Sequence, residues 1–140
     1  MKWAWRRIPS LSKRDIIMKN VAVWFELPVA DMDRAQAFYS AVFGHPLRAE
    51  TCPDTGLHMA VFDAEGAEVK GALVKGEGFV PGDQGALVYM NGGDDLAGPL
   101  GRAEAAGGVV VMPKTAIGPH GIIAQFRVSE GNRVGLHSMA

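Results

Sequence analysis

Residues 56–74 read GLHMAVFDAEGAEVKGALV, and residues 121–139 read GIIAQFRVSEGNRVGLHSM. An offset of 65 residues aligns Gly56 with Gly121 and the turn pair Glu65-Gly66 with Glu130-Gly131. Ahead of each stretch lie an apolar run, one or two acidic residues and a helical pattern that ends in glycine. Self-similarity at a fixed spacing indicates repeated structural units. We therefore expect two copies related by a pseudo-twofold axis, with a cavity between them.

The first apolar run, 21–29, alternates in the manner of a half-buried strand. Val21, Val23, Phe25, Leu27 and Val29 share one face, and Trp24 and Glu26 share the other. Asp31 is a suitable N-cap for the helix that follows, and Gly44 is a suitable stop. Strands are then predicted at 46–50, 57–63 and 68–75, with a hairpin turn at 64–66.

The same order returns after the linker 76–85, which is rich in glycine and proline. Strands are predicted at 86–90, 109–112, 121–128 and 133–139, a helix at 94–106 and a loop at 114–120. The prediction is an α+β fold of two tandem βαβββ modules, 18–75 and 86–140, whose curved, mostly antiparallel sheets surround a cavity.

The composition excludes some partners. The formal net charge is −1, which gives the molecule no overall attraction for nucleic acid. We find no apolar stretch long enough to cross a membrane. The single cysteine, Cys52, excludes an intrachain disulfide and suits a cytoplasmic protein.

Residues 1–17 differ from the rest of the chain because they carry Trp3, Trp5 and five basic side chains. We interpret them as an N-terminal extension upstream of a natural start at Met18. An amphipathic arm that docks through Trp3 and Trp5 is the alternative.

Several segments taken in order carry a family resemblance: 25–35 (FELPVADMDRA), Phe38-Tyr39, 42–44 (VFG) and 129–138 (SEGNRVGLHS). With the βαβββ repeat, they make residues 18–140 similar to the vicinal oxygen chelate superfamily. That superfamily contains glyoxalase I, bleomycin-resistance and fosfomycin-resistance proteins and extradiol dioxygenases. The chain most resembles its small bacterial glyoxalase-like members, and the resemblance implies a homodimer.

The resemblance also implies where a metal would be held, on the first and fourth strands of each module. Carried over, the positions are Trp24, Lys70 or Gly71, Leu87 or Val88, and Gly135. None of these residue types is an ordinary ligand for a divalent cation. We therefore predict no metal cofactor. A displaced site that combines histidines with Glu26 is the alternative.

Five residues remain as candidates for ligand binding. They are Trp24, Glu26, His58, Arg133 and His137. Trp24 offers a stacking surface and Arg133 a bidentate anion donor. Glu26 beside an indole on an inner face is expected to be partly desolvated, which makes it the candidate catalytic acid or base.

The predicted function is metal-free binding of a small aromatic or anionic molecule in the cavity. The alternative is a lyase, isomerase or dioxygenase of the glyoxalase type that uses a metal or Glu26.

Overall fold

A computed structural model describes residues 20–140, so the predicted extension 1–17 lies outside the described residues. The first module contains β1 (Trp24–Pro28), α2 (Met32–Phe43), β2 (Arg48–Thr51), β3 (His58–Phe62) and β4 (Lys70–Lys75). The second contains β5 (Val88–Asn91), α3 (Ala97–Ala105), β6 (Val109–Ala116), η2 (Gly118–His120), β7 (Ile122–Arg127) and β8 (Arg133–Ser138). Neither α-helix of the described chain has the length and hydropathy to span a bilayer.

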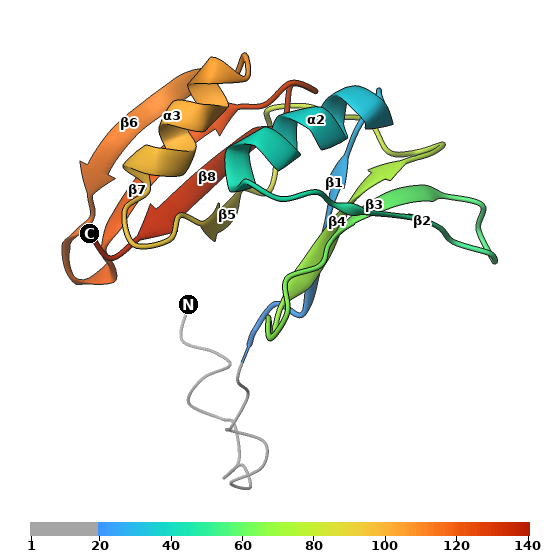
Figure 1. The fold of residues 1–140 in the computed structure, drawn as a ribbon, viewed down its shortest axis with the longest axis horizontal. Helices are drawn as coiled ribbons and strands as arrows, with labels where there is room; N and C mark the ends of the chain where they lie inside the picture. Colours follow the sequence, from blue (N-terminus) through green and yellow to red (C-terminus); the bar gives the residue numbers. More distant parts are fainter. Residues whose placement is uncertain (1–19) are drawn as a thin grey trace, which may run out of the picture.

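Each module forms one four-stranded sheet, and the two sheets have the same topology (Figure 1). The strand orders are β1-β4-β3-β2 and β5-β8-β7-β6. The outer strands β1 and β5 run parallel to β4 and β8, whereas the other pairs are antiparallel. The α+β prediction with tandem βαβββ modules is confirmed.

One predicted loop is wrong in part. The structure continues β6 to Ala116, because Thr115 and Ala116 pair with Ile123 and Ile122 across register shifts in the ladder. Only a short 3-10 turn at Gly118–His120 separates β6 from β7. Residues 114–120 are therefore not one free loop.

Both helices cover one face of their sheets and meet in a shared core. Asp31 caps α2 by accepting a hydrogen bond from the Arg34 N–H at 3.0 Å, and Gly44 ends it at φ 79°. Tyr39 at the centre of α2 is fully buried. The buried core cluster takes residues from both modules, Leu27 and Leu73 as well as Phe126 and Leu136 among them.

The β7–β8 turn fastens the second module to the start of α2. The Glu130 carboxylate is fully buried and accepts hydrogen bonds from the backbone N–H groups of Ala30 and Asp31 at 2.9 and 2.8 Å. Arg34 adds two bonds, from Nε at 2.6 Å and Nη2 at 3.0 Å. Asn132 donates to the Pro28 carbonyl at 2.7 Å. We call this cluster the Glu130 latch.

Candidate functional site

Each sheet has an open face, which we define as the face turned away from its helix. In the first module Trp24 and Glu26 lie on that face, in register with Lys70 and Ala72. Phe25 and Leu27 point the other way and pack with the core. In the second module Tyr89 and Gly135 lie on the open face, together with Arg133 and His137. The predicted alternation of β1 is thereby confirmed.

Glu26 is less enclosed than the sequence predicts. Its carboxylate is exposed, and it accepts a hydrogen bond from the Trp24 indole Nε1 at 3.3 Å. Trp24 itself is 44% exposed. The expected desolvation of Glu26 is wrong for the single chain, because Glu26 lies on an edge strand and stays exposed although it borders a small hollow with the 80–86 linker.

Arg133 is the cation on the open face that lacks an acidic partner. Its Nε atom is buried and has no hydrogen-bond partner in the described chain. It lines a small hollow of about 260 Å³ that also includes Glu26 and Asn132. Its neighbour in the ladder, Arg127, is instead paired with Asp83 at 3.2 Å. A buried guanidinium donor without an acceptor can hold an anion.

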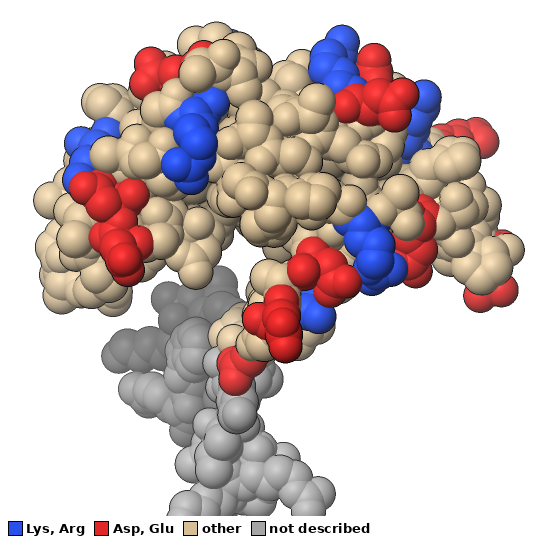
Figure 2. Space-filling model, viewed as in Figure 1, with Lys and Arg blue, Asp and Glu red and all other residues tan. Residues whose placement is uncertain are grey.

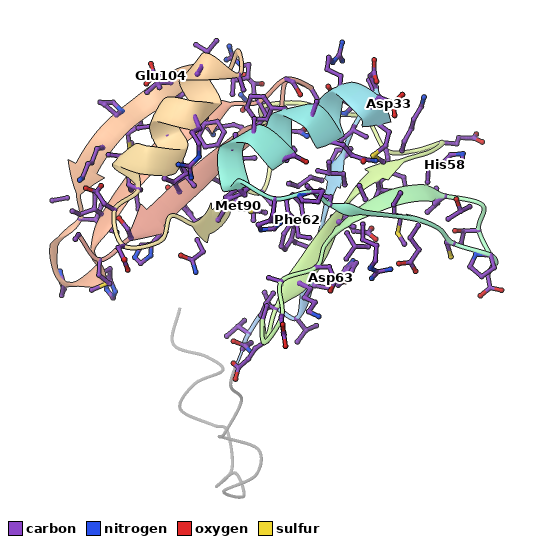
Figure 3. The ribbon with its side chains drawn as sticks, viewed as in Figure 1. Asp33, His58, Phe62, Asp63, Met90 and Glu104 are labelled. Atoms are coloured by element: carbon purple, nitrogen blue, oxygen red, sulfur yellow. The ribbon has the colours of Figure 1, made fainter. Side chains whose placement is uncertain are left out.

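The two candidate histidines lie far apart. His137 is on the open face, and its Nε2 donates to the His120 carbonyl oxygen at 2.5 Å, since a carbonyl only accepts. His58 has the same parity as Ala60 and Phe62, which pack toward the helix, and it is exposed at the outer end of β3 (Figure 3). The structure therefore brings Glu26 and Arg133 together, and Trp24 beside Glu26, but leaves His58 outside this group.

The metal positions do not fit a divalent cation. The register selects Lys70 over Gly71, because Gly71 turns its α-carbon toward the Phe25 ring on the helix side. Val88 packs against the core, which leaves Leu87. No group of three His, Cys, Asp or Glu side chains in residues 20–140 is arranged to hold a metal ion.

An aromatic side chain occupies the position of the last absent ligand. A β-carbon on Gly135 would lie 2.3 Å from the Tyr89 ring, so the ring lies directly over the glycine. The Tyr89 hydroxyl accepts a hydrogen bond from Gln125 Nε2 at 2.7 Å, and 41% of Tyr89 is exposed. Tyr89 and Gln125 are not among the residues predicted from the sequence, because their pairing with Gly135 depends on the strand register.

A second and larger hollow lies between the modules. It has a volume of about 750 Å³, and we call it the inter-module pocket. Its walls come from β1 and the β3–β4 turn on one side and from β5 on the other, and Phe43 at the end of α2 also lines it. Figure 3 shows Phe62 and Met90 on opposite sides of this space beneath α2. The sequence predicts a cavity between the copies but not this position for it.

Two βαβββ modules, each with one helix-covered face and one open face, define the fold of the vicinal oxygen chelate class. A family model and solved structures support placing the chain in this superfamily, which is also called the glyoxalase/bleomycin-resistance/dioxygenase superfamily. The family model "bleomycin resistance protein-like N-terminal" matches residues 22–62.

Solved structures agree with this assignment. TnmS3, an antibiotic-binding protein from Streptomyces sp. CB03234, is 28% identical at a TM-score of 0.64, over 88% of this chain and 99% of TnmS3. A glyoxalase/bleomycin resistance protein from the same organism is 28% identical at a TM-score of 0.63, over 84% and 99% of the two chains. A glyoxalase I mutant from Zea mays shares the fold at 22% identity and a TM-score of 0.64, over 84% of this chain and 46% of the maize chain. No curated protein matches.

Proposed function

We propose that this protein binds a small aromatic anion on its open faces without a metal cofactor. The observation that carries the proposal is the buried, unpaired Nε of Arg133 on the same face as the half-exposed ring of Tyr89. A guanidinium recognises a carboxylate, sulfonate or phosphate, and exposed aromatic rings offer surfaces for stacking. The similarity to TnmS3, an antibiotic-binding protein, supports binding rather than catalysis.

The donor chemistry also supports a binding role. Trp24, Lys70, Leu87 and Gly135 supply no ordinary metal ligand at the positions that matter in metal-dependent relatives. Glu26 is exposed and bound to the Trp24 indole, which favours a positioning role over acid–base catalysis. Its carboxylate, which lines the same small hollow as Arg133, would orient the ligand by repelling the anionic end toward that arginine.

The functional unit in this proposal is a cytoplasmic homodimer. Strands β1 and β5 are the outer strands of their sheets and present unpaired backbone groups. A second copy that brings its β5 beside β1 would place Tyr89 and Arg133 of one copy opposite Trp24 and Glu26 of the other. Such an arrangement would cover the open faces and enclose a site that a single chain leaves exposed.

The experiment uses 8-anilinonaphthalene-1-sulfonate, a fluorescent aromatic anion, with the full-length protein. We expect saturable binding that is unchanged by EDTA treatment. Arg133→Met should weaken it at least tenfold, because the anion loses its donor. Arg127→Met is the matched control, since it removes the same charge from the neighbouring position and should leave affinity within twofold.

Equal losses in the two arginine variants, or binding that requires an added divalent metal, would refute the proposal. Light scattering of the purified protein tests the dimer independently, and a monomer at micromolar concentration would exclude the closed site.

A further inference from the structure

Two sets of hydrogen bonds join the modules at the ends of α2: the Glu130 latch at its start, and the bond from Arg102 Nε to the Val42 carbonyl at 2.8 Å near its end. Among the described residues, the buried carboxylate is found at the first of these places only. At the β7–β8 turn, Glu130 closes the gap to the β1–α2 connection. The sequence repeat pairs Glu65 with Glu130, yet Glu65 is exposed and makes no hydrogen bond or ion pair with the described residues. The inter-module pocket opens between the β3–β4 turn and β5.

Local chemistry explains why Glu65 forms no equivalent of the Glu130 latch. The last paired residues are Phe62 with Gly71 and Arg127 with Arg133, which leaves 63–70 and 128–132 as the turns, so the first turn is three residues longer. The helix start it faces carries Asp94 and Asp95, which oppose a carboxylate, and offers no arginine at the place of Arg34. A second latch of the same kind is therefore disfavoured.

The pocket walls are apolar and aromatic. Phe62 lies at the centre of three phenylalanines, with its ring centroid 5.7 Å from Phe25 and 6.1 Å from Phe43. Val88 and Met90 form the opposite wall. Figure 2 shows a mostly uncharged surface across the middle of the molecule, with charged side chains toward its periphery. A volume of about 750 Å³ lies within the roughly 300–1,000 Å³ of small-molecule sites.

The polar groups at the rim favour a neutral ligand. Among the described lining residues, Lys70 is the permanent cation, and its ammonium is already 3.3 Å from Asp63. His45 and Asn91 remain as exposed hydrogen-bonding groups. The Asn91 Oδ1 accepts from the Gly93 N–H at 2.8 Å, which leaves its amide hydrogens for a ligand.

We infer that the inter-module pocket is a second binding site, specific for an uncharged polycyclic aromatic molecule that carries a hydrogen-bond acceptor. The rings lie against Phe25, Phe43 and Phe62, and the acceptor faces Asn91. This pocket shares Tyr89 with the proposed anion site and Val88 with the small hollow, but Arg133 does not line it, so the Arg133 variant distinguishes the two proposals.

Two fluorescent probes with the same ring skeleton separate the sites. N-phenyl-1-naphthylamine is uncharged, whereas 8-anilinonaphthalene-1-sulfonate adds only a sulfonate to it. We expect the full-length protein to bind the neutral probe at one site per chain. Ala67→Trp and Ala22→Trp, which fill the pocket from two lining positions, should each weaken neutral-probe binding at least tenfold.

Two control variants should leave binding of the neutral probe intact. Ala105→Trp adds the same side chain on an exposed position of α3 and should leave neutral-probe affinity within twofold. Arg133→Met should weaken binding of the sulfonate probe and leave binding of the neutral probe unchanged. Absence of neutral-probe binding, or binding that survives both pocket-filling variants while their urea midpoints stay at the wild-type value, would overturn the inference. Loss of neutral-probe binding in Arg133→Met would overturn it as well.

Discussion

The two hairpin turns that face the opposite module have different surroundings. The β7–β8 turn places Glu130 in a buried cluster of hydrogen bonds at the start of α2, whereas the β3–β4 turn leaves Glu65 exposed beside a pocket of about 750 Å³. The sequence repeats the pair Glu-Gly at both turns. The difference arises from what each turn meets, an arginine and free N–H groups at one end and two aspartates at the other. Of two repeated turns, one can therefore stabilise the fold while the other borders a binding pocket.

The strongest test of the comparison removes the two glutamates in turn. Glu130→Ala should lower the free energy of unfolding by about 3 kcal/mol, because two backbone N–H groups and Arg34 lose their acceptor. Glu65→Ala should change it by no more than about 0.5 kcal/mol, as for an ordinary surface position. Urea unfolding followed by circular dichroism measures both. Equal effects would contradict the asymmetry.

Acid should weaken the latched end selectively. Burial alone would raise the pKa of Glu130, but the hydrogen bonds from Arg34, Asp31 and Ala30 outweigh it and lower the pKa from 4.5 to about 2. A pKa lowered by folding stabilises the protein above the unfolded value and loses that contribution as pH falls from about 4.5 toward 2. The loss amounts to about 3 kcal/mol.

Glu130→Gln isolates this contribution from the other carboxylates, because its side chain does not titrate. The free energy of unfolding of the wild type should therefore fall toward that of Glu130→Gln as the pH is lowered from 5 to 2.5. A difference that stays constant over this range would show that the Glu130 pKa is not lowered by folding.

Each module has a glycine in contact with an aromatic ring, and these two glycines extend the comparison of the modules. A β-carbon on Gly71 would lie 2.5 Å from the Phe25 ring, which packs against the core, so Gly71→Ala should cost about 2 kcal/mol. Gly135→Ala meets Tyr89, whose ring is partly exposed and can turn away, so we expect a loss of about 1 kcal/mol. Thermal unfolding of the two variants compares them, and the opposite order would contradict these placements.

The smallest effect is expected from the second residue of the latch. Asn132 accepts from the Gly82 N–H at 2.9 Å and donates to the Pro28 carbonyl. Asn132→Ala should cost about 1 kcal/mol, since these groups are partly buried and water can replace some of the lost bonds. A loss larger than that of Glu130→Ala would move the centre of the latch from Glu130 to Asn132.

The sequence predicts the fold better than the site. Alternation in 21–29 correctly separates Trp24 and Glu26 from Phe25 and Leu27, because period-two patterning acts through local geometry. The environment of Glu26 could not be read in this way, since exposure depends on whether another strand covers β1. His58 was misplaced because its face depends on the register of β3, which the sequence alone does not give.

The Glu130 latch also could not be predicted from local sequence patterns. The sequence predicts a turn at Glu130-Gly131, but the partners of Glu130 lie near residue 30, about a hundred positions away. Only packing of the two modules brings them together. The same packing determines the inter-module pocket, which has no motif of its own.

Amide hydrogen exchange at the two β–α connections tests the asymmetry most directly. Val29 and Gly92 make equivalent backbone bonds, to Val74 and His137, so Ala30 and Asp31 correspond to Gly93 and Asp94. We predict that the Ala30 and Asp31 amides exchange at least a hundredfold more slowly, relative to their unstructured rates, than those of Gly93 and Asp94. Equal protection at the two connections would contradict a buried carboxylate latch on Ala30 and Asp31 that Gly93 and Asp94 lack.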